Sequence, residues 1–217
     1  MGRNPEKDAI QMAATNRRIL ENGFRVFTEK TIEKANLTDV AEAANLGIAS
    51  IYRYYPAKQD LVLAVGAWAW ETYYREYNGR VSGEEIEKRT GAEDFECYLE
   101  SFLDLYRSHR DLLRFNQFFN MYLLSEGIPA DAMNPYTEMI RERAGRFSVT
   151  YRKGREDGTL RTDLSEKQMF SVTLHLMLAV VTRYAVGLAY MDGTDVEKEL
   201  NLQKRMLLRE FVAEDKG

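Results

Sequence analysis

Four neighbouring side chains, Tyr52, Arg53, Tyr54 and Lys58, combine hydroxyl groups with positive charge. They lie in the segment ANLGIASIYRYYPAK, residues 44–58, which is too short to form a stable helix alone. Phenol, guanidinium and ammonium groups are donors suited to phosphate oxygens. Because a hydrophobic core does not need this much polarity, the segment is predicted to face a binding surface.

Residue types used in catalysis and metal binding form no recognisable pattern. The single cysteine and the two histidines, Cys97, His109 and His175, match no enzyme spacing, and no phosphate-binding loop occurs. A row of carboxylates at helical spacing is a solvated helix face by default: Glu96, Glu100 and Asp104. We therefore expect neither enzymatic activity nor a metal site, and no cofactor.

Charge is distributed unevenly along the 217 residues, whose formal net charge is −4. Residues 1–60 hold nine Lys/Arg against eight Asp/Glu, whereas residues 61–217 hold 21 against 26. A nearly neutral first part with clustered basic groups can still dock on phosphate, while an acidic remainder is held away from it. The lone cysteine, the absence of an apolar leader and an apolar run too short for a bilayer (172–181) indicate a cytoplasmic protein.

Helical spacing of apolar residues dominates the chain, and alternating strand patterns are nearly absent. The sequence predicts an all-α fold of about nine helices, with residues 80–92 as a loop or weak helical extension. The expected helices are 8–29, 36–45, 48–54, 57–79, 93–108, 111–126, 130–157, 165–191 and 195–213. We expect a three-helix domain over 1–60 and a larger helical bundle over 61–217.

The segment 36–58 has the pattern of a helix-turn-helix, in which the second helix enters the major groove of DNA. Asn36 and Asp39 fit an N-cap with an acid three residues later. Asn45 lies at the turn, where asparagine tolerates the left-handed conformation. Small Ala41 and Ala44 permit close helix crossing.

This stretch resembles the N-terminal DNA-binding domain of the TetR family of bacterial transcriptional regulators. That pattern has an aromatic closing the first helix, then "I-A-x-x-A-G-V-S" and "T-L-Y-x-Y-F-x-x-K-x-x-L". Without a gap, this chain matches it with Phe27, Val40-Ala41, Ala44-Asn45-Leu46-Gly47, Ser50-Ile51-Tyr52-Arg53-Tyr54-Tyr55, Lys58 and Asp60-Leu61, over about residues 10–63. It departs from the pattern where Asn45 replaces the turn glycine, Gly47 the serine cap and Thr31 a glycine after the first helix.

The resemblance implies roles for individual residues. Phosphates would be bound by Tyr52, Tyr54, Lys58 and the helix start around Asn36. Residues near base edges or sugars would be Thr38, Ile48, Ala49, Ser50 and Arg53. Ile48 and Ala49 cannot hydrogen-bond a base, so we expect them to contact thymine methyl groups.

The resemblance also implies homodimerisation through the last two long helices. Their apolar stripes are Leu174, Leu178, Val181, Ala185 and Leu188, then Val196, Leu200, Leu207 and Phe211. The stripes alone fit a monomer core equally well.

Residues 68–151 are rich in aromatics, most of which must be core. We expect a ligand pocket for a hydrophobic or aromatic molecule, lined by Trp70, Tyr74, Phe102, Tyr106, Phe119, Tyr122 and His175. Other candidate polar groups are Asn116, Gln117 and Asn120. Together these features predict a repressor that a small molecule releases from a palindromic DNA operator. The alternative is a helical small-molecule sensor or adaptor without DNA binding.

Overall fold

The computed structural model describes residues 5–80, 83–129, 134–161, 163–189 and 192–213. Over these residues the chain is all-helical, with one isolated bridge between Leu160 and Val212. Contacts divide it into two compact units. Unit 1 runs to Thr72 and includes Phe115–Thr137, and unit 2 comprises Tyr73–Arg114 and Glu138 onwards. No helix in the described ranges is long and apolar enough to cross a membrane.

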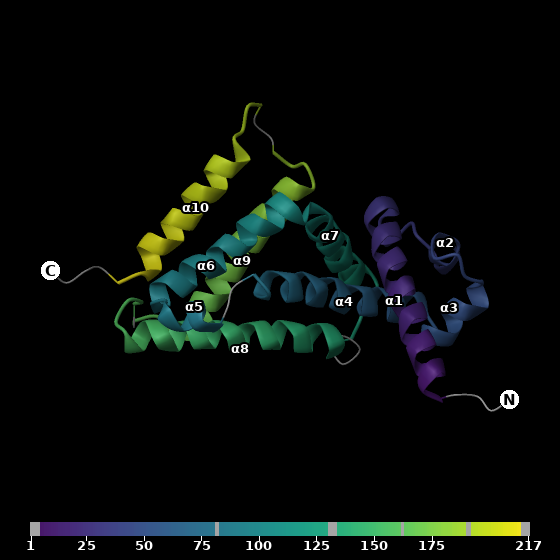
Figure 1. Cartoon of the computed structure of the whole chain (residues 1–217). Coiled ribbons are helices and arrows are strands. Elements are labelled where there is room, and N and C mark those ends of the chain that lie inside the picture. Colours follow the sequence, from purple (N-terminus) through teal and green to yellow (C-terminus); the bar gives the residue numbers. More distant parts are fainter. Residues whose placement is uncertain (1–4, 81–82, 130–133, 162, 190–191, 214–217) are drawn as a thin grey trace. The chain divides into compact units, whose positions relative to one another are not determined.

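Unit 1 contains α1 (Pro5–Lys30), α2 (Leu37–Ala43), α3 (Ile48–Tyr54) and the first part of α4 (Lys58–Asn78), as Figure 1 shows at the purple and blue end of the colour bar. It also takes the end of α7 (Arg110–Ser125) from Phe115 onwards. The core of this unit joins apolar residues from all five helices, including Phe27, Val40, Ile51, Leu61 and Phe119. The helices α2 and α3 are therefore anchored on a common apolar core.

Small residues let the helices of unit 1 approach closely. A Cβ at Gly23 of α1 would lie 3.0 Å from Val65 of α4, and one at Gly66 would lie 2.8 Å from the Phe119 ring. Phe119 also stacks on Phe115, with ring centroids 5.7 Å apart. The end of α7 is thus built into the core of the unit that carries α3.

Unit 2 contains α5 (Gly83–Lys88), α6 (Gly91–Ser108), α8 (Asn134–Glu156), α9 (Glu166–Ala185) and α10 (Val196–Phe211). The helices α6, α9 and α10 pack against one another (Figure 1). The backbones of α6 and α8 are in close contact at the start of α6. A Cβ added at Gly91 would lie only 2.1 Å from the Gly154 Cα.

The helix positions confirm most of the sequence prediction. The described residues hold ten helices where about nine were expected, and the addition is α5, predicted as a loop or weak extension. Acidic Glu84 and Glu85 in its first turn and Lys88 in its last complement the helix dipole. The helix predicted over 165–191 ends at Ala185, because Gly187 adopts φ 82°. Residues 130–133, expected at the start of the α8 helix, lie outside the described residues.

The predicted dimer stripes need correction. Val181 on α9 and three stripe residues on α10, Leu200, Leu207 and Phe211, are buried within the single chain. The exposed apolar residues of this region are Val172 (44%), Leu176 (56%), Leu188 (42%), Leu202 (50%) and Met206 (60%). Four of the nine predicted residues thus belong to the monomer core, because an apolar stripe does not say which face the monomer covers. Leu188 is exposed, and the other four are half-buried and stay a prediction: Leu174, Leu178, Ala185 and Val196.

Candidate nucleic-acid interface

The start of α2 is fixed by a complete capping box. The Asn36 side-chain oxygen accepts from the Asp39 N–H at 2.9 Å, and the Asp39 carboxylate accepts from the Asn36 N–H at 2.9 Å. Lys30 donates to the same carboxylate at 2.7 Å. The hydrogen bond from Lys30 is the largest cause of a lowered Asp39 pKa. Asn36 and Thr38 are exposed, so this helix start is open to solvent with its acidic group neutralised.

The turn between α2 and α3 follows the prediction for Asn45, which has φ 50°. The Leu46 N–H returns to the Ala41 carbonyl at 2.9 Å. Gly47 then serves as the N-cap of α3 without a side-chain hydrogen bond. This tight turn fixes the direction in which α3 leaves α2.

One face of α3 is buried and the other is open. Ile51 is fully buried, and Tyr55 just beyond the helix is buried with its hydroxyl donating to Asn16 at 2.7 Å. The outward residues are Ile48, Ala49, Tyr52 and Arg53, with Ser50 half-buried between the two faces. Tyr52 is 52% exposed and Ile48 37%, although both are large and mainly apolar. Such exposure on a seven-residue helix is typical of a binding surface.

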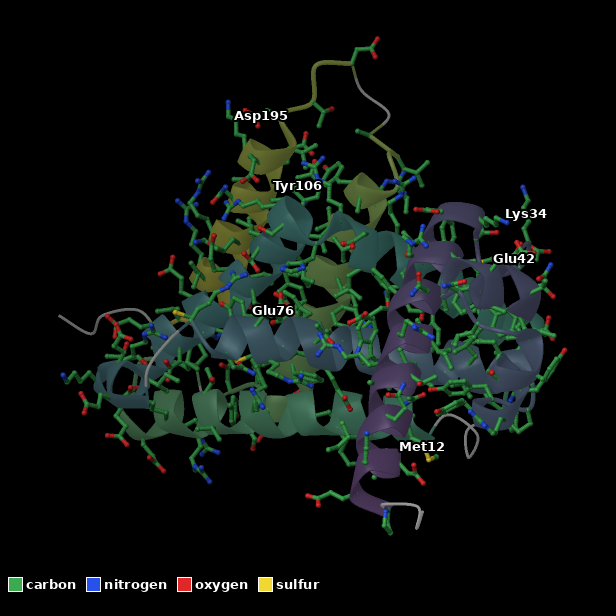
Figure 2. All side chains as sticks on the ribbon, turned by 45° about the vertical axis from the view of Figure 1, so that its right-hand side comes forward. Met12, Lys34, Glu42, Glu76, Tyr106 and Asp195 are labelled. Atoms are coloured by element: carbon green, nitrogen blue, oxygen red, sulfur yellow. The ribbon has the colours of Figure 1, made fainter. Side chains whose placement is uncertain are left out.

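Two of the predicted phosphate-binding residues already have partners inside the protein. The Tyr54 hydroxyl donates to the Met12 carbonyl at 3.3 Å on α1 (Met12 is labelled in Figure 2), and the Arg53 guanidinium lies 5.5 Å from the Tyr54 ring centre. The Lys58 ammonium donates to the Glu33 carbonyl at 3.2 Å. It also lies 5.5 Å from the Tyr122 ring centre. Tyr54 therefore ties α3 to α1 in addition to any contact it makes with a phosphate.

Two further residues, Lys34 and Tyr122, lie in segments that contribute to unit 1. Lys34 is exposed in the segment before α2. Tyr122 was assigned to a ligand pocket because it belongs to the aromatic-rich segment. Its position over Lys58 depends on tertiary packing, for which the sequence carries no signal.

The seven predicted pocket residues are divided between the two units. Trp70, Phe119 and Tyr122 are buried in unit 1, and Phe102 and Tyr106 are buried in unit 2, where Tyr74 is half-buried and His175 is exposed. His175 is exposed in this chain, because helical spacing places it beside exposed Val172 and Leu176. A single lining formed by all seven stays a prediction.

Asn116 is the strongest polar candidate inside unit 1. It is 2% exposed, and its side-chain oxygen has no hydrogen-bond partner among the described residues. A buried carbonyl oxygen left in this state costs free energy, so a bound donor would stabilise it.

Comparison with known families shows what the segment that carries this surface is similar to. Residues 19–65, which contain the end of α1, all of α2 and α3 and the start of α4, match the family described as bacterial regulatory proteins, tetR family. This part of the chain is therefore similar to the tetR family. The match agrees with the resemblance predicted over about residues 10–63.

Solved structures extend the TetR-like fold over nearly the whole chain. A TetR family transcription regulator from Marinobacter aquaeolei has 16% identity and a TM-score of 0.65, with 95% of this chain and 100% of that chain covered. The regulator FadR from Bacillus subtilis, solved with stearoyl-CoA, has 15% identity and a TM-score of 0.69, with 88% and 97% covered. A protein from Saccharomonospora viridis, solved with choline, has 17% identity and a TM-score of 0.73, with 93% and 100% covered. No curated protein matches the sequence closely.

Proposed function

We propose that this TetR-family chain is a cytoplasmic repressor that binds a palindromic duplex-DNA operator as a homodimer and is released by a small molecule. The observation that carries the proposal is the open face of α3, with Ile48, Ala49, Tyr52 and Arg53 outward on a helix whose other face is buried. A helix presented in this way by a capped α2 and a tight turn fits the major groove of DNA.

The α3 surface supports two kinds of DNA contact. Tyr52, Tyr54 and Lys58 are assigned to phosphates together with Asn36, whose side-chain NH2 group remains a donor while its oxygen caps α2. Base edges and sugars are assigned to Thr38, Ile48, Ala49, Ser50 and Arg53. Ile48 and Ala49 would contact thymine methyl groups, so an operator without thymine at those positions would contradict this assignment.

The homodimer would form through the exposed faces of α9 and α10. Leu176 is 56% exposed on α9 and Met206 is 60% exposed on α10. Exposed Val172 lies four residues before Leu176 and exposed Leu202 four residues before Met206, so each pair shares one face of its helix. Two subunits reading two half-sites supply specificity that one short helix does not.

The effector is proposed to be a hydrophobic or aromatic small molecule. The aromatic content of residues 68–151 supports this class, and the two neighbours solved with stearoyl-CoA and choline bind ligands of different chemistry. Effector binding would shift the population of α4 poses and thereby the spacing of the two α3 helices. A coupling free energy of about 1–3 kcal/mol would suffice, and DNA must weaken effector binding by the same factor.

Fluorescence anisotropy tests DNA binding directly. Binding is first measured to overlapping duplexes that cover the DNA upstream of the gene, and then by selection from a pool of random duplexes. Both experiments are carried out at low and at high salt. We expect selective, salt-sensitive binding that Tyr52→Ala/Lys58→Ala abolishes and that Lys198→Ala, a change of an exposed lysine on α10, leaves intact. Failure to select any sequence would overturn the proposal and favour a sensor without DNA binding.

The effector site has its own test at Asn116. In an effector screen on the protein–operator complex, Asn116→Leu should lose the response to an effector that the wild-type chain recognises. The same variant should retain operator affinity, because Asn116 lies in the core and not on the α3 face. A full effector response in the variant would remove Asn116 from the site.

A further inference from the structure

Lys58 occupies a position that disfavours a positive charge. It is the first residue of α4, where the helix dipole repels cations, and it is half-buried. Burial lowers its pKa from the ordinary value of 10.5. Glu126, Glu33 and Asp39 favour the charge of Lys58 from a distance, but their effect is smaller than that of burial, and the Asp39 carboxylate is already paired with Lys30. Asp60, two residues later, accepts the Ala57 N–H at 2.9 Å as a cap would. The positive charge of a lysine at this position does not stabilise the fold, which points to a use other than folding.

Two groups of unit 1 hold the Lys58 ammonium in place. The Glu33 carbonyl, three residues before the N-cap of α2, accepts one hydrogen bond at 3.2 Å. The Tyr122 ring centre lies 5.5 Å from the ammonium nitrogen, within the range of a cation–π interaction. The ring is itself fixed, because Tyr122 is 7% exposed and belongs to the unit 1 core.

The bonding of the ammonium leaves room for a further ligand. A lysine ammonium has three N–H donors, and the carbonyl of Glu33 takes one of them. The attraction between the ammonium and the Tyr122 ring is electrostatic, so it does not occupy an N–H group in a directed hydrogen bond. Two N–H groups therefore remain for an anionic oxygen while the side chain stays in place.

We propose that Tyr122 is a positioning residue for DNA binding, which holds the Lys58 ammonium beside the segment leading into α2, ready for a DNA backbone phosphate. Tyr122 acts through Lys58 and does not itself contact DNA. A free lysine side chain loses rotamer freedom when it binds, and the Tyr122 ring removes that cost in advance. The inference rests on the proposed function and assigns to α7 an effect on operator affinity that is exerted through Lys58.

A double-mutant cycle on operator affinity tests the proposal. Tyr122→Leu should weaken operator binding about three- to tenfold, the cost of one unrestrained side chain. Tyr122→Phe keeps the ring and should stay close to wild type. In a Lys58→Met background, Tyr122→Leu should have no further effect, because the group that Tyr122 positions is gone.

The salt dependence separates positioning from direct contact. Lys58→Met should reduce the slope of log affinity against log salt by about 0.9, the value for one lost phosphate contact. Tyr122→Leu should leave the slope unchanged, because Lys58 still reaches the phosphate once bound. A merely structural role of Tyr122 would lower affinity equally in both Lys58 backgrounds, and that result overturns the proposal. Tighter DNA binding by Tyr122→Leu also overturns it, since the ring would then be holding Lys58 away from DNA.

A measurement without DNA keeps this inference distinct from the proposed function. In the free protein, the Tyr122 ring current should displace the NMR signals of the Lys58 side chain from ordinary lysine positions. The displacement should persist in Tyr122→Phe and vanish in Tyr122→Leu, or in Tyr122→Met if the leucine variant does not fold. Ordinary Lys58 signals in the wild-type chain would overturn the inference, whereas displaced signals in a chain that selects no DNA would overturn the proposed function and the DNA role of Tyr122 with it.

Discussion

The two units differ in which residue types adopt the left-handed backbone conformation. In the described residues of unit 2, the left-handed positions are glycines: Gly158, Gly187 and Gly193. In unit 1, Gly127 is also left-handed, but so are two residues that are not glycine: Thr31 with φ 68° and Asn45 with φ 50°, on either side of α2. A β-branched residue is destabilised in this conformation by about 1–2 kcal/mol. Among the described residues, non-glycine left-handed positions thus occur only next to α2 and α3, as expected if the local geometry there serves the proposed DNA binding.

Exposed apolar residues differ in a similar way between the units. On α3 of unit 1 they are interspersed with Tyr52 and Arg53, which suits a charged groove. On α9 of unit 2 they include Val172 and Leu176 with exposed Ala179, which suits a second apolar helix. The composition of each exposed face therefore indicates a different partner.

The largest effect on stability is expected at the backbone contact inside unit 2. Gly91→Ala would place its Cβ 2.1 Å from the Gly154 Cα, and the backbone must move apart. We expect a loss of about 3 kcal/mol in the free energy of unfolding, measured by urea denaturation. Gly145→Ala on α8 is the matched control, because a Cβ there meets nothing within 4 Å. The control should gain about 0.5–1 kcal/mol from helix propensity, and equal losses in both variants would contradict the close contact.

The next largest effect concerns subunit association. Leu176→Glu buries a charge in the proposed interface and should weaken the dimer by about 100-fold, measured by analytical ultracentrifugation. Leu124→Glu provides the comparison in unit 1, since Leu124 is 77% exposed on α7 and lies outside the proposed interface. A dimer that survives Leu176→Glu, or that Leu124→Glu disrupts equally, would place the interface elsewhere.

Matched capping boxes allow a direct comparison of the units. Asn36 caps α2 in unit 1, and Ser165 caps α9 in unit 2 with the same reciprocal hydrogen bonds. Alanine at either position should cost about 1 kcal/mol of stability, measured by urea denaturation. Only Asn36→Ala should also weaken operator binding, because α2 orients α3. Equal operator affinity in the two variants would separate the α2 cap from DNA binding.

The sequence was most informative where local rules fix the structure. The bounds predicted for α3, 48–54, are those observed, because Asn45 at the turn and Pro56 after the helix act within a few residues. The capping signal at Asn36 was equally local and appears in the structure. The family motif combined these short-range signals in one register.

The sequence was least informative where distant segments meet. Aromatic residues at helical spacing are the same in a core and in a pocket lining, so Phe119 could not be recognised as a partner of Gly66. The stripes on α9 and α10 likewise hid which face the monomer covers, and only Leu188 of five exposed residues was included. The contact between Lys58 and Tyr122 joins residues 64 positions apart, beyond the reach of any periodic pattern.

A smaller effect should appear in acid titrations of two capping carboxylates. The pKa of Asp39 in unit 1 is lowered from 3.8 mainly by the Lys30 hydrogen bond, and that of Glu93 in unit 2 is lowered from 4.5 mainly by the backbone of Thr90. A lowered carboxyl pKa contributes stability above the ordinary pKa, and that stability is lost as the pH falls through the lowered value. NMR titration at low and high salt should show the Asp39 pKa rising with salt while that of Glu93 changes less, because salt screens the exposed ion pair. Equal salt responses would mean that Lys30 does not control Asp39.

The smallest effect is a gain in stability at the strained turn after α1. Thr31→Gly removes a β-branched side chain from φ 68°, worth about 1–2 kcal/mol, but adds backbone freedom to the unfolded chain. We expect a net gain of about 0.5 kcal/mol by urea denaturation. Asn45→Gly should gain less, because asparagine tolerates the left-handed region. If the strain also orients α2 for DNA, Thr31→Gly should weaken operator binding while it raises stability. A variant that gains stability with unchanged operator affinity would show that the threonine has no part in DNA binding, and the contrast between the two units would then be one of folding alone.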